Sequence, residues 1–301
     1  LRAELSDIDI VQQTLDESDD QLYADFFPTI HTSYQFTDEH SMQLSYSRRI
    51  DRPHFWLLNP FFNYTDSRNI RAGNPKLTPE YTNAYEGGYL FKSGKTSVYA
   101  GSYFRDTRDV IHRINDVDTA TGVTYIIPIN YARQQSLGVE ANLSLDLFKW
   151  WTFSGDVNFY QYHTWGDYEG QNLTTRSNSW NTRLNSRLKL KNDFDLQAIF
   201  FYRGKRQTAQ GHLEPFYMLN LAASKDILDG DGTITLNVRD ALNTRQFTYI
   251  IDEPELYSEN THYWRSRSIT LTFIYRLNQK KQHGAGKRGG QPDFDGSDMG
   301  I

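Results

Sequence analysis

Residues 41–91 constrain the fold most, because two alternating segments flank an unusually long connection. The first segment has apolar residues at every second position: Met42, Leu44 and Tyr46. The second has aromatic residues two or four positions apart: Tyr85, Tyr89 and Phe91. About thirty residues rich in Pro, Asn, Gly, Arg and aromatics separate the two, whereas hairpin loops in compact soluble domains usually have about two to five residues. Long loops that alternate with tight turns are typical of bacterial outer-membrane barrels.

The rest of the chain continues this organisation. The clearest alternation lies in residues 139–145, where apolar positions alternate with Glu140, Asn142 and Ser144. The pattern predicts about twelve strands of roughly 10–14 residues, long enough at about 3.3 Å per residue and a tilt near 40° to cross the apolar layer. We expect tight turns near Thr37, Ser93, Phe148, Asn192 and Gly230. We expect long loops at 6–22, 52–80, 115–123, 166–178, 207–213 and 244–262. The predicted fold is an all-β transmembrane antiparallel barrel.

The composition fits this class and excludes several others. The chain has 301 residues, a net charge of -5, 38% hydrophobic and 15% aromatic residues. A negative net charge gives no electrostatic basis for binding nucleic acid. No run approaches the roughly twenty apolar residues that a membrane-spanning helix needs. A barrel is compatible with a mean hydropathy of -0.68, because its strands show apolar residues to lipid and polar residues to the lumen. Cysteine is absent, which excludes disulfides and thiolate metal sites.

The polar faces of the strands supply candidates for the barrel lumen. Arg183 and Arg187 lie opposite the apolar face of one predicted strand, and Glu140 lies opposite the apolar face of another. Toward lipid, each Arg would cost on the order of 2–4 kcal/mol at mid-depth, so we expect these side chains in a wet lumen. A solvent-exposed face of a soluble sheet would have the same pattern.

Several motifs in a fixed order resemble TonB-dependent outer-membrane receptors, in particular the outer-membrane β-barrel branch common in Bacteroidota. They are YSRRIDRP at 46–53, LNPF at 58–61, GNPKLTPEY at 73–81, EGGY at 86–89, FKWW at 148–151 and NVRDALN at 237–243. Each motif is moderately specific, whereas their order and spacing are more specific. The resemblance covers nearly the whole chain.

The resemblance implies a barrel of twenty-two strands, of which this chain would be about the C-terminal half. It further implies a plug domain and a TonB box, neither of which is present here, so TonB itself is an expected partner. Residues 1–277 form the predicted barrel part, and residues 278–301 a disordered Gly- and Lys-rich periplasmic tail. Because the chain begins at Leu1 inside a predicted strand, we expect it to be the C-terminal part of a longer protein. The tight turns would then be periplasmic and the long loops extracellular. Other expected partners are the lipid bilayer, lipopolysaccharide and a surface lipoprotein.

The sequence contains no catalytic constellation and no spaced set of metal ligands, so we expect neither an enzyme nor a cofactor. The candidates for contact with a solute lie in the long loop: His54, Trp56, Tyr64, Arg68 and Arg71. Aromatic planes with Arg side chains suit sugars, aromatic siderophores or carboxylates. The alternative is that Phe55, Trp56, Leu57 and Phe61 pack the loop onto the barrel mouth. Arg183 and Arg187 could line a solute path, or pair with carboxylates of a plug.

The leading functional hypothesis is a TonB-dependent receptor of the bacterial outer membrane that imports a scarce solute. Two alternatives remain at this point. One is a barrel without transport activity that acts as a structural or secretion-complex component, and the other is a soluble β-sandwich or carbohydrate-binding module. A plug domain and a TonB box upstream would separate the first two hypotheses. The sequence does not identify the solute.

Overall fold

The computed structural model describes residues 1–12, 17–254, 256–264 and 267–277. Nearly all regular structure in it is β, and the predicted tail, 278–301, lies outside the described residues. Among the described residues, no helix is long and apolar enough to cross a membrane. The first half contains β1 (Arg2–Gln12), β2 (Glu17–Phe27), β3 (Thr29–Gln35), β4 (His40–Asp51), α1 (Phe55–Leu58), β5 (Asn69–Arg71), β6 (Glu80–Ser93), β7 (Thr96–Asp118) and β8 (Val123–Phe148).

The second half continues the same pattern of long strands, with short strands in the connections. It contains β9 (Trp151–Trp165), β10 (Asp167–Tyr168), β11 (Gln171–Asn172), β12 (Thr175–Lys189), β13 (Phe194–Arg203), β14 (Arg206–Thr208), β15 (Gly211–Leu213), β16 (Phe216–Ile227), η1 (Leu228–Gly230), β17 (Gly232–Arg239), β18 (Gln246–Glu253), β19 (Leu256–Tyr263) and β20 (Ser268–Tyr275).

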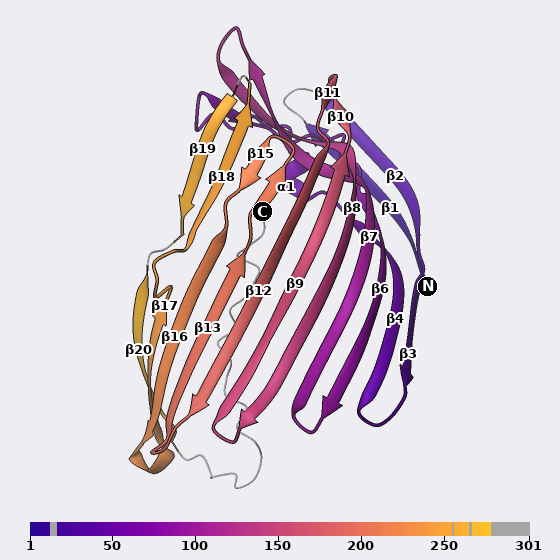
Figure 1. Cartoon of the computed structure of the whole chain (residues 1–301). Coiled ribbons are helices and arrows are strands. Elements are labelled where there is room, and N and C mark those ends of the chain that lie inside the picture. The colour runs from indigo at the N-terminus through magenta and orange to yellow at the C-terminus, as the bar shows by residue number, and fades with distance from the viewer. Residues whose placement is uncertain (13–16, 255, 265–266, 278–301) are drawn as a thin grey trace.

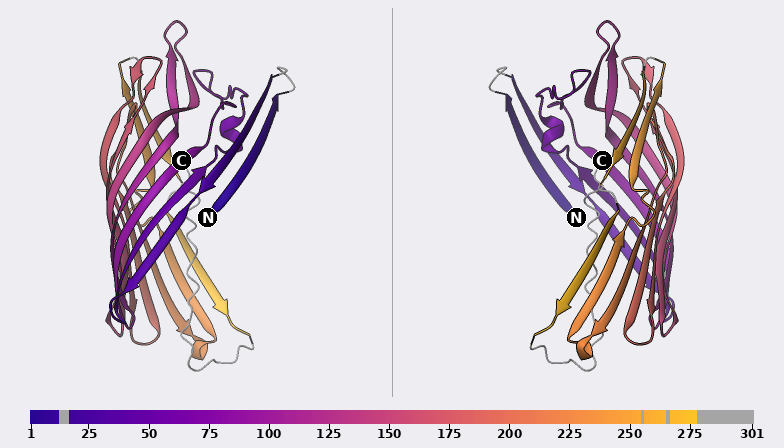
Figure 2. Two further views of the ribbon diagram at one scale, coloured as in Figure 1. Left: turned by 90° about the vertical axis from the view of Figure 1, so that its right-hand side faces the viewer. Right: turned by 90° about the vertical axis from the view of Figure 1, so that its left-hand side faces the viewer.

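One 12-stranded sheet dominates the molecule (Figure 1). Its strand order is β20-β17-β16-β13-β12-β9-β8-β7-β6-β4-β3, and β5 joins it as a parallel partner of β8. Consecutive long strands are antiparallel neighbours, as expected for an up-and-down barrel. The sheet is strongly curved but not closed, because within the described residues β3 and β20 do not pair with each other (Figure 2). The predicted all-β, antiparallel barrel architecture is therefore confirmed for this part of a barrel.

The N-terminal segment of the structure differs from the expectation. Residues 6–22 were expected to be a loop, but β1 and β2 pair along their whole lengths, from Arg2–Phe27 to Gln12–Glu17. This hairpin forms a separate two-stranded sheet. Pro28 separates β2 from β3, and proline interrupts a ladder because it has no N–H to donate. The carbonyl of Pro28 still accepts a hydrogen bond of 3.1 Å from the backbone N–H of Arg48.

The tight turns and long connections lie at opposite ends of the sheet, as the sequence predicted (Figure 1). Strand lengths vary more than expected, however, from 23 residues in β7 and 26 in β8 down to 7 in β3 and 8 in β17 and β20. The expected loops at 166–178, 207–213 and 244–262 contain the short hairpins β10–β11, β14–β15 and β18–β19. Loop 115–123 shrinks to a turn between β7 and β8. These segments pair because their backbone N–H and C=O groups need hydrogen-bond partners. Such pairing leaves no periodic pattern in the side chains, so the sequence did not predict it.

The sheet has one apolar and one polar face. Strand pairing places a row of apolar side chains side by side, two to eight residues from the strand ends at the tight turns: Phe91, Val98, Leu143, Leu184, Phe200 and Leu219, with Gly155 between Leu143 and Leu184. The adjacent row faces the other way and carries Tyr99, Asn142, Asp156 and Arg183. In a membrane barrel the apolar face meets lipid and the polar face lines the lumen, so we call them the outer and inner faces.

Candidate functional site

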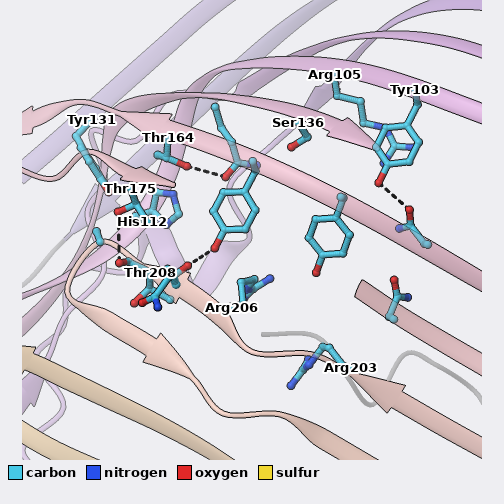
Figure 3. A pocket seen from close by; sticks show the side chains of 17 residues that line it. Tyr103, Arg105, His112, Tyr131, Ser136, Thr164, Thr175, Arg203, Arg206 and Thr208 are labelled. Carbon is cyan, nitrogen blue, oxygen red and sulfur yellow. Dashed lines mark hydrogen bonds between the residues drawn. The ribbon is translucent and has the colours of Figure 1, made fainter. Parts of the chain in front are cut away.

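A polar pocket of about 470 Å³ lies on the inner face, in the half of the sheet nearer the long connections (Figure 3). Cross-strand pairing explains how distant residues meet there. Asn158 of β9 lies opposite Asn181 of β12, which lies opposite Arg203 of β13. Tyr103 of β7 completes the wall and donates a hydrogen bond of 3.1 Å to the side-chain oxygen of Asn158. This side of the pocket is therefore formed by neighbouring barrel strands rather than by loops.

The hairpin of β14 and β15 covers the pocket from above. The backbone N–H of Gln207 donates to the Ser177 hydroxyl at 3.0 Å, and the Thr175 hydroxyl donates to the Thr208 carbonyl at 3.3 Å. The Tyr162 hydroxyl donates to the Gln207 carbonyl. These bonds hold the hairpin against β9 and β12, so one wall of the pocket consists of its backbone and its Arg206 side chain.

Gln210, at the tip of this hairpin, connects it to β7. The side-chain oxygen of Gln210 accepts bonds of 2.9 and 3.0 Å from the backbone and side-chain N–H groups of Asn115. Its amide N–H donates to the Asn115 carbonyl at 3.0 Å. Gln210 is 5% exposed, and the two residues are 95 positions apart. This pair bridges β7 and the β14–β15 connection at the loop end of the sheet.

The pocket lining is rich in Tyr and Arg. It includes Tyr103, Tyr131, Tyr160, Tyr162, Arg105, Arg203, Arg206 and His112. Arg105 pairs with Glu86 at 3.0 Å, and Arg203 lies over the rings of Phe216 and Phe247 at 5.8 and 5.5 Å. Guanidinium and phenol groups together offer several donors in fixed directions. The pocket is therefore suited to a solute with acceptor oxygens.

The lining of this pocket includes buried polar atoms that have no hydrogen-bond partner in the described part of the chain. The rings of His112 and Tyr131 lie 5.5 Å apart, and His112 Nε2 and the Tyr131 hydroxyl make no hydrogen bond to any residue that the structure describes. The same holds for the side-chain oxygen of Asn181. Buried polar atoms in native proteins are nearly always satisfied, so these three groups are available to a bound solute or to water. Among the described residues, no group of three or more His, Asp or Glu side chains is placed to hold a metal ion.

The predicted loop candidates do not line this pocket. His54 stacks on Trp56 with ring centroids 5.0 Å apart, and Trp56 and Tyr64 are each 66% exposed. Arg71 lies in β5 beside Ile126 of β8. Arg68 donates its backbone N–H to the Asp66 carboxylate at 2.9 Å. The Asn69 side chain, with the backbone N–H groups of Arg68 and Asn69, holds the pKa of Asp66 below its ordinary value.

The alternative interpretation, in which aromatics pack the loop onto the barrel mouth, is contradicted by the exposure of these aromatics, although Leu57 is half-buried. Phe55 and Phe61 are 79% and 56% exposed. Leu77, which is completely buried, and Ile70, which is 8% exposed, anchor the loop instead. The GNP motif needs glycine at position 73, because the backbone there lies very close to the end of α1. A Cβ atom on Gly73 would lie 2.5 Å from the carbonyl oxygens of Leu57 and Asn59.

The predicted lumenal residues lie on the inner face. Glu140 is paired directly with Asn158, a pocket residue. Arg183 lies opposite Asp156, nearer the tight turns. Arg187 donates to the Asp195 carboxylate at 2.9 Å and is thereby tied to β13. None of the three contributes to the pocket itself, and their lumenal role stays a prediction.

The sequence did not predict the pocket, although the strand pattern does predict the facing of some of its residues. Tyr103, Asn158 and Asn181 occupy polar-face positions that strand alternation predicts. His112 and Tyr131 could not be assigned in this way, because the β7–β8 register shifts between Thr107 and Val110. Asp109 has a φ of 58° at this irregularity. Such bulges re-aim the side chains that follow.

The chain belongs to the outer membrane protein β-barrel family, whose model matches residues 1–275. It is accordingly a protein of the bacterial outer membrane. Among curated proteins, none matches this sequence.

Solved structures with a similar fold include two uptake receptors and a copper transporter. The siderophore receptor PirA from Pseudomonas aeruginosa is 15% identical with a TM-score of 0.55, covering 76% of this chain and 41% of its own. The ferric yersiniabactin uptake receptor FyuA from Yersinia pestis is 14% identical with a TM-score of 0.54, covering 85% and 37%. The copper transporter OprC is 11% identical with a TM-score of 0.60, covering 88% and 41%. The chain thus spans about two fifths of each of these proteins, and the resemblance to TonB-dependent receptors is confirmed at the level of the fold.

Proposed function

We propose that this barrel belongs to a TonB-dependent receptor that imports a scarce solute across the outer membrane. The observation that carries the proposal is the inner-face pocket, where Tyr and Arg side chains surround buried polar atoms that have no hydrogen-bond partner among the described residues. A barrel that only served as a scaffold would have no need to leave such groups unsatisfied, since each costs on the order of 1–3 kcal/mol. The names of the structural neighbours, which are siderophore receptors and a copper transporter, support the same class.

In this proposal the solute first meets the exposed loop aromatics and then the inner-face pocket. Trp56, Tyr64 and the Arg68 and Arg71 side chains are the outer contacts, and Arg105 and Arg206 the inner ones. Glu140, Arg183 and Arg187 line the lower part of the path. The proton-motive force supplies the energy through the TonB complex, which engages a plug domain of the same protein. A surface lipoprotein is a further partner.

The proposal is tested with the full-length protein in a strain that lacks the chromosomal gene. Cells are offered labelled ferric iron, haem, cobalamin, peptides and glycans in turn. We expect uptake of one of these to fall on deletion, to return with the native gene and to stop when the proton gradient is dissipated. The Arg206→Ala variant should lower that uptake at least about tenfold, because a charge-assisted hydrogen bond contributes about 1.5–3 kcal/mol.

Lys149→Ala is the matched control, since Lys149 is an exposed cation in a tight turn far from the pocket. Surface expression of each variant is measured by protease accessibility of the loops. The alternative, a structural or secretion-complex barrel, predicts no change in uptake of any solute and a stable envelope complex that is lost on deletion. That outcome would refute the transport proposal.

A further inference from the structure

The β14–β15 hairpin crosses the inner face instead of prolonging the strands that it connects. It leaves β13 and returns to β16, which are neighbours in the sheet. Its backbone bonds to Thr175 and Ser177 of β12 and to Tyr162 of β9 (Figure 3). Its tip bonds to Asn115 of β7. In the strand order β12, β9 and β7 lie successively farther from β13, so residues 204–215 form a bar across the inner face, which we call the crossbar.

The far end of the crossbar is held by Gln210 and Asn115, a pair that we call the clasp. β6 pairs with β7 only as far as Arg108, so beyond that point one edge of β7 has no strand beside it in the described part of the chain. The Gln210 amide takes the place of a strand, because it accepts from the Asn115 backbone N–H at 2.9 Å and donates to the Asn115 carbonyl at 3.0 Å. An amide side chain supplies both a donor and an acceptor. Gln210 is also buried, which shields the clasp from competing water.

The crossbar is also fixed to the neighbouring hairpin of β18 and β19. All three residues of β15 pair with β18, and the backbone N–H of Asp252 donates to the Gln210 carbonyl at 3.0 Å. This close approach requires glycine at position 211, because a Cβ atom there would lie 1.9 Å from the Ile250 carbonyl oxygen. The crossbar is thus attached at its base, along its length and at its tip.

The crossbar bounds the inner-face pocket on one side. Arg206, Thr208 and Ala209 of the crossbar belong to the pocket lining, together with Ser136 and other residues of the barrel strands. The pocket has a volume of about 470 Å³, and pockets of about 300–1,000 Å³ typically hold drug-sized molecules. A compact solute therefore fits between the crossbar and the strands, whereas the crossbar obstructs a chain of several sugar or peptide units.

We propose that the crossbar sets an upper size limit for the solute of the inner-face pocket, and that Gln210 is the residue that maintains this limit. The inference rests on the proposed function and adds the class of solute, which is a compact molecule rather than an oligosaccharide or a longer peptide. Gln210 is not part of the pocket lining, and its side chain is engaged at Asn115. It is therefore a positioning residue, which acts on the solute through the crossbar.

The test measures which reagents reach a cysteine in the pocket of the full-length protein in intact cells. The chain has no cysteine, and any cysteine in the rest of the protein is replaced by serine. Ser136→Cys places one thiol in the pocket lining, and Thr119→Cys, at the exposed turn between β7 and β8, gives the reference rate. N-ethylmaleimide is the small probe, and a cyclodextrin-coupled maleimide is the bulky one. We expect the small probe to label both proteins and the bulky probe to label only Thr119→Cys.

Three changes to the Ser136→Cys protein test the crossbar. Gln210→Ala should raise the ratio of bulky to small labelling rates about tenfold, because the clasp loses three hydrogen bonds. Replacing residues 204–215 by an Asn-Gly turn should bring the ratio to that of Thr119→Cys. Such a turn suffices because Arg203 and Phe216 are direct cross-strand partners. Thr261→Val is the matched control, since it removes a hydroxyl pair of the β18–β19 hairpin outside the crossbar, and it should leave the ratio unchanged.

Gln210→Glu separates the clasp from a folding defect. Only the protonated carboxyl group both donates and accepts, so the ratio should be near the native value at acidic pH and raised at neutral pH. Equal ratios in the native protein, in Gln210→Ala and in the protein with the Asn-Gly turn would overturn the size limit. Failure of the small probe to label Ser136→Cys would overturn the proposed function as well, because solutes would then not reach the pocket from outside.

Discussion

The two ends of the long sheet follow different rules. At the end with the tight turns, apolar and polar side chains alternate, and the rows of the outer face continue from strand to strand, with a β8–β9 irregularity between Asp146 and Phe148 beside the turn itself. At the end with the long connections, the β7–β8 register slips, short hairpins fold over the sheet, and a polar pocket forms beneath them. The difference shows that the membrane environment determines the side-chain pattern of the first region, whereas contacts between segments remote in sequence determine the structure of the second.

The largest effect is expected from placing a charge in the turn-end region of the outer face. Leu143 lies opposite Val98 and Gly155, about five residues from the turn, which places it near mid-depth. Leu143→Arg should destabilise the barrel in lipid by about 2–4 kcal/mol. Urea titration of the full-length protein in lipid vesicles measures this loss.

Asn142→Arg is the matched control, because Asn142 is the neighbouring inner-face residue and lies opposite Asp156. It should leave the unfolding midpoint nearly unchanged. If the two substitutions were equally destabilising, the assignment of the two faces would be wrong.

The next largest effect concerns the close packing of Tyr103 on Gly138. A Cβ atom at Gly138 would lie 2.4 Å from the ring carbon Cζ of Tyr103, so Gly138→Ala must displace the ring and its hydrogen bond to Asn158. Overpacking of this kind costs about 1–3 kcal/mol. The free energy of unfolding should fall by that amount.

Two comparisons sharpen this prediction. Gly87→Ala should cost less, because its Cβ would meet only the mobile end of Leu44 at 3.0 Å. Combining Gly138→Ala with Tyr103→Leu should recover part of the loss. An additive double variant would show that the ring is not the cause.

A more local effect is expected at the loop end. Gln210→Ala leaves the backbone N–H and carbonyl of Asn115 without partners, a loss of about 1–3 kcal/mol confined to this region. Hydrogen exchange at Asn115 should accelerate, while exchange at Leu143 near the turns should not change. Equal acceleration at both amides would mean that the two ends unfold as one unit, contrary to the comparison.

The smallest effect is a pH dependence in the long loop. The Asn69 side chain and two backbone N–H groups lower the pKa of Asp66 from its ordinary value of 3.8. A lowered folded pKa means that the turn is stabilised above about pH 4, and that this stabilisation is lost as the pH falls through the folded value. The amide proton shift of Arg68 should therefore titrate below pH 4, and Asp66→Asn should abolish the titration. A titration midpoint above 4 would contradict the hydrogen-bonded turn.

Much of the fold could be predicted from the sequence, because a strand that separates lipid from water must alternate. Residues 139–145 of β8 and the apolar side of β12 show this directly, and the tight turns near Ser93, Phe148 and Asn192 follow from it. The hairpins within the predicted loops were missed, because their pairing satisfies backbone groups and leaves no periodic signature. The pocket was missed for a related reason: the bulge near Asp109 changes which side chains face inward.

The sequence by itself determined the class of protein, the two faces of the sheet and the separation of tight turns from long connections, since these depend on neighbours two residues apart. Only the tertiary structure brought Gln210 to Asn115 and placed His112 beside Tyr131. Each of these depends on strand register. Register is fixed when many weak cross-strand contacts are satisfied together, so it cannot be inferred from one segment of the chain.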